Sequence, residues 1–187
     1  MKKKLILIGA STGGPGHLEK ILSSLEDNYP YIIIIAQHMN ELFIPSLVKR
    51  FKEIVSTPVY IGQEHKVIKA PCIIFTQADI TELTCNSSGD LMLYKHKEET
   101  PYLPSINTLF TSASTLASKF DILAILLTGI GDDGAKGLLT LKNTGAKTLA
   151  ENEESAIVYG MPKVAREIDA AYSYLNLQDL IVEIKKF

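Results

Sequence analysis

The chain has 187 residues, of which 46% are hydrophobic and 21% are charged, with a formal net charge of -2, two cysteines and no tryptophan. This profile is typical of one ordinary soluble domain, which we expect to span residues 1–187. A chain of this length buries roughly 70% of the surface that its unfolded form exposes, so it needs neither disulfides nor a structural metal. The composition excludes a disordered chain and a mini-protein scaffold.

The charge and the apolar segments exclude two further classes of protein. A near-neutral chain is not expected to bind nucleic acid, which requires a basic face or block. The basic run at residues 2–4 is interpreted as the solvated start of a first strand, because no amphipathic helix follows it. The apolar runs are too short for a signal peptide or a membrane span. Cys72 and Cys85 are isolated and read as reduced thiols. We therefore expect a cytoplasmic protein that does not insert into a membrane.

The first half of the chain begins with a strand-helix-strand unit. Residues 5–8 and 31–36 are continuous apolar runs rich in β-branched side chains, which is typical of strands buried on both faces of a parallel sheet. Residues 15–25, between them, carry apolar side chains at helical spacing and predict the connecting helix. A second helix is predicted over residues 44–53.

The middle of the chain changes character. Residues 58–94 contain short β-rich pieces broken by glycine, proline and a polar turn at 86–90, which predicts hairpins. The remaining pattern predicts helices at 104–119, 134–142, 162–167 and 177–185 and strands at 122–127 and 147–150. The economical fold is α/β: a doubly wound, mostly parallel sheet with flanking helices and a β-hairpin-rich middle segment, in a single domain.

A glycine-rich segment follows the first strand. Residues 9–16 read GASTGGPG, and the spacing of Gly9, Ser11 and Gly13 matches a G-x-S-x-G elbow, which presents a serine hydroxyl at a tight strand-to-helix turn. The same geometry also suits a loop that cradles a phosphate at a helix N-terminus. Neither a dinucleotide fingerprint nor a P-loop motif is present. From this segment alone, a nucleophilic serine and a phosphate cradle remain equally open.

Two further strand ends carry reactive side chains. The second strand ends at His38, and the third is followed by Asp132 and Asp133. A lone histidine is more often packed or solvated than catalytic, and Asp-Asp-Gly is commonly a turn with a helix cap. However, the carboxyl ends of strands in an open α/β sheet share one edge. We therefore expect Ser11, His38 and Asp133 to lie close together, with the aspartate orienting the imidazole.

The other histidines lack such a position. His17 lies on the first predicted helix and is expected to be structural or exposed, whereas His65 and His96 lie in the β-rich middle, where solvated turns are expected. The chain order of serine, histidine and aspartate also differs from the order in α/β-hydrolases, so the elbow alone does not indicate that family.

With these residues in place, the sequence resembles the catalytic domain of the CheB-type protein-glutamate methylesterases of bacterial chemotaxis. The resemblance covers nearly the whole chain and rests on five blocks in the family's order, at residues 8–15, 36–39, 104–110, 127–135 and 154–162. Each block is modest alone, and the five together are highly specific.

The resemblance implies roles for individual residues. Ser11 would be the nucleophile, His38 the general base and Asp133 the orienting carboxylate. The backbone N–H of Ile130 would contact the oxyanion, and Thr12 is a candidate for orienting the site. Asp132 would fill a variable position, and the block at 160–162 receives no chemical role.

The resemblance also implies an activity. The expected reaction is hydrolysis of γ-glutamyl methyl esters on the cytoplasmic helical domain of methyl-accepting chemotaxis receptors, with deamidation of receptor glutamines through the same acyl-enzyme. No metal or organic cofactor is expected. The rivals are a non-catalytic phosphate- or nucleotide-binding module that uses residues 9–16 and a partner-binding domain with impaired catalysis.

Two departures from the family's pattern accompany the resemblance. The family's Ala-Pro-Gly-x-x-His segment corresponds here to residues 75–81, FTQADIT, which lack the glycine and the histidine. The family's N-terminal receiver domain has no counterpart in the sequence, which begins at the first strand of the catalytic domain. We therefore expect an esterase that is not covered by a receiver domain in cis.

Overall fold

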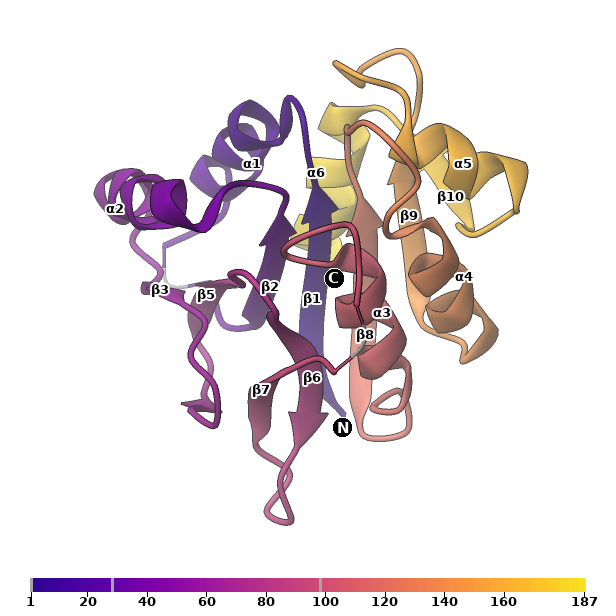
Figure 1. Cartoon of the computed structure of the whole chain (residues 1–187). Coiled ribbons are helices and arrows are strands. Elements are labelled where there is room, and N and C mark those ends of the chain that lie inside the picture. Colours follow the sequence, from indigo (N-terminus) through magenta and orange to yellow (C-terminus); the bar gives the residue numbers. More distant parts are fainter. Residues whose placement is uncertain (1, 28, 98) are drawn as a thin grey trace.

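The computed structural model describes residues 2–27, 29–97 and 99–187. Within these residues, seven strands form a parallel sheet with helices on both faces, and three short strands form a separate antiparallel sheet (Figure 1). The predicted α/β fold with a doubly wound sheet is confirmed. No helix in this part of the chain is long and apolar enough to cross a bilayer.

The main sheet has β1 near its centre. Its spatial order is β10 (Ser173–Leu175), β9 (Lys147–Glu151), β8 (Phe120–Leu126), β1 (Lys3–Ala10), β2 (Ile32–Gln37), β5 (Cys72–Phe75) and β3 (Val59–Ile61). The antiparallel sheet has the order β4 (Val67–Ile68), β7 (Leu91–Lys95) and β6 (Ile80–Cys85).

The helices divide between the two faces of the main sheet (Figure 1). One face carries α1 (Gly14–Ser23), α2 (Ile44–Ile54) and α6 (Leu177–Lys186). The other carries α3 (Ile106–Ser114), α4 (Ala135–Asn143) and α5 (Met161–Glu167), together with the antiparallel sheet. A short 3-10 helix, η1 (Glu41–Phe43), precedes α2.

The central strands are apolar without interruption because both faces of the sheet are covered. In β1, Leu5 and Leu7 join the core beneath α3, α4 and α5, whereas Ile6 and Ile8 join the core beneath α1, α2 and α6. This alternation follows from the two-residue period of a strand. The same period fixes the register, because a slip of one residue would exchange the two faces.

The order of the strands places a switch point beside β1. From β1 the chain proceeds to β2, and it later returns to the opposite side of β1 with β8. Ligands of open α/β sheets bind outside the carboxyl ends of the strands at such a point. The segments that follow β1, β2 and β8 therefore meet there.

The middle of the chain differs partly from expectation. The hairpin around residues 86–90 is present as β6 and β7, with the Asn86 side chain accepting hydrogen bonds from the Ser88 and Asp90 N–H groups at 2.9 Å. However, β3 and β5 do not form hairpins: they add to the parallel sheet beyond β2. A four-residue run such as β5 is too short for its sequence to show which strand it pairs with. Its pairing with β2 and β3 follows from the packing of the whole sheet.

Two smaller corrections concern the second half. The helix predicted over residues 104–119 is shorter, because Ser105 caps α3 by accepting a hydrogen bond from the Thr108 N–H, and α3 ends at Ser114. The edge strand β10 was not predicted from the sequence. It spans three half-buried residues, too few for a periodic signal.

Candidate active site

Ser11 directly follows β1 at the turn into α1. Its N–H donates to the Thr128 carbonyl at 3.0 Å, which fixes the turn against the end of β8. Gly13 adopts a positive φ of 85°, and a Cβ there would lie 2.7 Å from the Ile157 side chain, so the turn requires glycine. The turn thus presents Ser11, 9% exposed, just before the N-terminus of α1.

His38 follows β2, the neighbour of β1. The parallel register pairs Ala10 with Gln37, and the His38 N–H donates to the Ala10 carbonyl at 2.9 Å. The hydrogen-bond ladder between β1 and β2 therefore continues to the last residue of β1 and the first residue after β2. As a result, Ser11 and His38, which directly follow these two adjacent strands, lie side by side.

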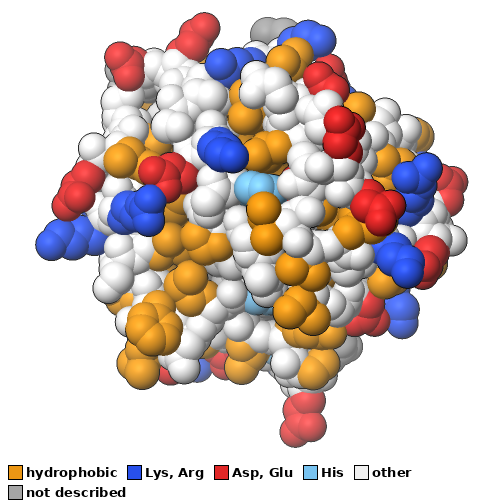
Figure 2. Space-filling view, turned by 90° about the horizontal axis from the view of Figure 1, so that it is seen from above, with side chains coloured by type: hydrophobic (Ala, Val, Ile, Leu, Met, Phe, Trp, Pro, Cys, Tyr) orange, Lys and Arg blue, Asp and Glu red, His pale blue; other side chains and the backbone are white. Residues whose placement is uncertain are grey.

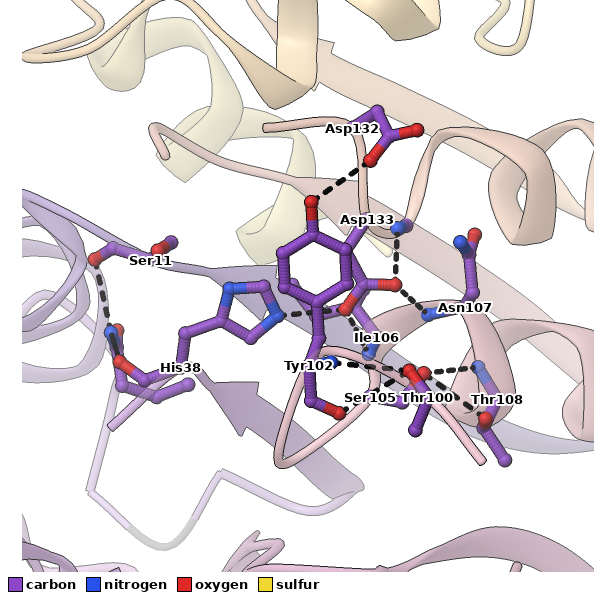
Figure 3. Close-up of polar contacts among 12 residues, drawn as sticks. Ser11, His38, Thr100, Tyr102, Ser105, Ile106, Asn107, Thr108, Asp132 and Asp133 are labelled. Atoms are coloured by element: carbon purple, nitrogen blue, oxygen red, sulfur yellow. Dashed lines mark hydrogen bonds and ion pairs between the residues drawn. The ribbon is translucent and has the colours of Figure 1, made fainter. Parts of the chain in front are cut away.

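Asp133 lies in the loop after β8 and accepts four hydrogen bonds. Oδ2 accepts from His38 Nε2 at 2.7 Å and from the Ile106 N–H at 2.8 Å. Oδ1 accepts from the N–H groups of Asn107 at 2.9 Å and Gly134 at 3.0 Å (Figure 3). Two of these donors belong to the first turn of α3, whose dipole stabilises a carboxylate. These contacts hold the Asp133 carboxylate, whose side chain is only 1% exposed, in place to accept a hydrogen bond from the imidazole.

The orientation of the imidazole assigns its two nitrogens. Figure 3 shows the His38 ring between Ser11 and Asp133. Since Nε2 donates to Asp133, Nδ1 is the unprotonated nitrogen that can accept a proton from Ser11. Among the hydrogen bonds of the described residues, none joins Ser11 Oγ to the ring. Such bonds are often long in unliganded enzymes and tighten when substrate binds.

Gln37 is a site residue that the sequence analysis missed. Its side chain is 1% exposed, and Nε2 donates to the Ser11 carbonyl at 2.9 Å and to the His38 carbonyl at 3.0 Å. One buried amide thus joins the backbone of the serine to that of the histidine. The available signal was a polar residue at the end of an otherwise apolar strand.

A buried network of polar side chains holds the backbone of the turn that carries Ser11. Glu151, at the end of β9, is completely buried and accepts hydrogen bonds from the Thr128 N–H and the Ser155 hydroxyl, both at 2.8 Å. It also pairs with His17 Nδ1 of α1 at 3.2 Å. Since the Thr128 carbonyl in turn holds the Ser11 N–H, Glu151 links α1 to the nucleophile turn.

His17 is thus structural, one of the two expected outcomes, and His65 is 63% exposed, as expected of a solvated turn.

Thr12 and Ile130 carry candidate oxyanion donors. A Cβ on Gly129 would lie 2.5 Å from the Ser11 Cβ, so the loop that contains Ile130 packs directly against the serine. The Gly129 carbonyl is held by the Gly160 N–H at 3.1 Å, which gives the 160–162 block a supporting role. Within the described part of the chain, the N–H groups of Thr12 and Ile130 donate to no protein acceptor. Both are available to a ligand.

Tyr102 covers the imidazole and was also missed. Its ring is parallel to that of His38, with the centroids 5.1 Å apart and an interplanar angle of 1°. The Tyr102 hydroxyl donates to Asp132 Oδ1 at 3.0 Å, and this hydrogen bond raises the pKa of the phenol. Asp132 is therefore linked to the site through Tyr102. The loop before α3 has no periodic pattern, and nothing in the sequence singled out this tyrosine.

Exposed apolar side chains surround this edge of the sheet. Figure 2 looks down on it and shows hydrophobic side chains gathered near the middle of the face. Five large exposed residues lie in η1, in the segment before α3 and in the loops after β8 and β9: Leu42, Phe43, Leu103, Ile130 and Ile157. Apolar surface of this kind is typical of a site that meets a macromolecule.

The sequence profile of the CheB methylesterase family matches residues 6–184. The chain belongs to this family. Among its similar proteins is the protein-glutamate methylesterase/protein-glutamine glutaminase of Shewanella frigidimarina, which is 34% identical over 185 residues, or 98% of this chain and 46% of that protein. The Nitrosospira multiformis protein of the same name is 36% identical over 177 residues, covering 95% of this chain and 49% of that protein.

A solved structure is similar over the whole chain. The catalytic domain of the Thermotoga maritima CheB methylesterase superposes with a TM-score of 0.90 at 28% identity, covering 100% of this chain and 99% of that one. The chain spans about half the length of the curated relatives that it matches. The fold and the CheB family membership are thus shown, as the resemblance implied.

Proposed function

We propose that residues 1–187 form a catalytic domain that hydrolyses γ-glutamyl methyl esters on methyl-accepting chemotaxis receptors and also deamidates receptor glutamines. The observation that carries this proposal is the contact of 2.7 Å between His38 Nε2 and Asp133 Oδ2, beside Ser11 at the switch point of a CheB-family fold. The names of the similar proteins support both activities. The chain would act in the cytoplasm, where the helical domains of these receptors lie.

The chemistry follows from the assigned nitrogens. Ser11 Oγ attacks the ester carbonyl while His38 Nδ1 accepts its proton, and Asp133 stabilises the imidazolium that forms. The N–H groups of Thr12 and Ile130 would stabilise the oxyanion. The imidazolium then protonates the departing methoxide, so methanol leaves and a glutamyl-serine ester remains.

Water completes the cycle. His38 removes a proton from a water molecule that attacks the acyl-enzyme, and the serine recovers its proton as the glutamate departs. A glutamine substrate gives the same acyl-enzyme with ammonia as the leaving group. None of these steps requires a cofactor.

The test compares two serine variants. Ser11→Ala is expected to reduce methanol release from a methylated receptor by at least about 10³-fold, because it removes the nucleophile. The control is Ser46→Ala, an exposed position on α2, which should retain normal activity and stability. Ester hydrolysis by Ser11→Ala at the wild-type rate would contradict the proposal.

The phosphate-cradle alternative makes a different prediction. A loop that only binds phosphate has no use for a histidine and a buried aspartate beside its serine, so the contact between His38 and Asp133 favours the esterase. Calorimetric titration with ATP distinguishes the two functions. Tight ATP binding together with no labelling of Ser11 by a fluorophosphonate would favour the cradle.

A further inference from the structure

We propose that Tyr102, held by Asp132, is a positioning residue that fixes the ring plane of His38 and stabilises the imidazolium during catalysis. The inference rests on the proposed function, since it gives His38 the role of general base. It adds two residues to the site, one of which the resemblance had placed at a variable position.

The first step concerns the freedom of the imidazole. Asp133 holds His38 at one atom, Nε2, and a single hydrogen bond fixes a point without fixing the rotation of the ring about it. Tyr102 supplies the missing restraint, because its parallel ring with a centroid distance of 5.1 Å is an offset stack. The two contacts together determine the direction in which Nδ1 points.

The second step concerns the anchoring of Tyr102 itself. Its hydroxyl donates to Asp132 at 3.0 Å, and its N–H donates to the Thr100 hydroxyl at 3.2 Å. Gly131, at φ 86°, leaves the space: a Cβ there would lie 2.6 Å from the Tyr102 hydroxyl. The loop after β8 is thus shaped around the phenol. The adjacent residues Asp132 and Asp133 restrain His38 from two directions, one through Tyr102 and the other directly (Figure 3).

The third step concerns charge. When His38 accepts the serine proton, a cation forms against the electron-rich face of the phenol, and this contact is favourable. Donation of the hydroxyl proton toward Asp132 increases the electron density of the ring. Because the imidazolium exists only after proton transfer has begun, the stabilisation should appear in kcat rather than in KM.

The chain offers a matched control for the test. Tyr94 and His65 form a second pair of rings, edge to face with centroids 4.6 Å apart, in the exposed middle of the chain. NMR spectra of the histidine ring protons can therefore compare Tyr102→Leu with Tyr94→Leu. Tyr102→Leu should remove the ring-current shift of His38 and leave His65 unchanged, and Tyr94→Leu should do the reverse.

Activity measurements give the second readout. Tyr102→Leu should lower kcat about twofold to fivefold at unchanged KM, the change that corresponds to a partly exposed cation–π contact. Tyr102→Phe keeps the ring and loses the hydroxyl anchor, so it should recover most of the kcat and much of the ring-current shift. Thermal unfolding confirms that each variant is folded.

The outcomes separate this proposal from the proposed function. Unchanged His38 signals in folded Tyr102→Leu, or a kcat equal to that of the wild type, would overturn the role of Tyr102. A wild-type protein without esterase activity would instead overturn the proposed function, and the NMR comparison would still decide whether Tyr102 orients the ring. A loss of activity that Tyr102→Phe fails to restore would show that the ring is not the stabilising element.

Discussion

Replacement of Asp133 by asparagine tests the arrangement of the site most directly. The carboxylate receives donors at both oxygens: His38 Nε2 and the Ile106 N–H at Oδ2, and the N–H groups of Asn107 and Gly134 at Oδ1. An asparagine presents one oxygen and one NH₂ group, and the NH₂ group cannot accept. Either orientation of the amide therefore leaves at least one backbone donor unpaired in a buried site.

The two orientations differ in cost. With the NH₂ group at the Oδ1 position, two backbone donors lose their acceptor, whereas at the Oδ2 position only the Ile106 N–H does. Each buried donor left unpaired costs about 1–3 kcal/mol, so the second orientation should prevail, with a loss of about that size in unfolding free energy. However, an NH₂ group facing Nε2 makes that nitrogen the acceptor and places the ring proton on Nδ1. The histidine can then no longer accept the proton of Ser11.

Asp133→Asn should consequently fold and be almost inactive. In serine proteases, replacing the orienting aspartate by asparagine fixes the wrong tautomer and costs on the order of 10⁴ in kcat. Urea unfolding followed by far-UV circular dichroism suits a chain without tryptophan, and methanol release from methylated receptor measures activity. The control is Asp121→Asn, an exposed aspartate on β8. If Asp133→Asn had unchanged stability and activity within tenfold of wild type, the assigned tautomer and the stabilising role of the four hydrogen bonds to Asp133 would both be refuted.

The remaining predictions concern Gln37 and the two thiols. Gln37→Glu removes both amide donors and buries a carboxylate, so unfolding free energy should fall by about 2–4 kcal/mol and methanol release by more than tenfold. Gln77→Glu, a half-buried amide that donates to the Gly62 carbonyl, should have little effect on either quantity, and equal losses in both variants would contradict the special role of Gln37. Burial raises the pKa of Cys72 to about 11. Because a buried thiol this far below its pKa is almost entirely protonated and unreactive, a disulfide reagent at pH 8 should modify only the half-buried Cys85 until urea exposes Cys72. Two fast-reacting thiols in the native protein would contradict this.

The sequence was sufficient for the central strands of the main sheet because they carry an unambiguous local pattern. Continuous β-branched runs specify strands buried on both faces, and helical spacing between the first two specifies a parallel crossover. Parallel strands end at one edge, so the residues after each run could be placed together without coordinates. This reasoning brought Ser11, His38 and Asp133 to one site, and the structure has them there. The tight turn at Gly13 could also be predicted locally, from the spacing of Gly9, Ser11 and Gly13.

The sequence by itself therefore determined the family, the central strands of the sheet and the three strand ends, since each depends on residues close together in the chain. Tertiary structure alone decided which side chains act on one another. His38 and Asp133 lie 95 positions apart, and only their approach reveals which imidazole nitrogen is left for the serine. Three features arise from packing between separate segments. They are the hydrogen bonds from the Gln37 amide to the Ser11 and His38 carbonyls, the stacking of the Tyr102 ring on His38, and the addition of β3 and β5 to the parallel sheet. Contacts of this kind depend on how loops close over the strand ends, and no periodicity in the sequence records that.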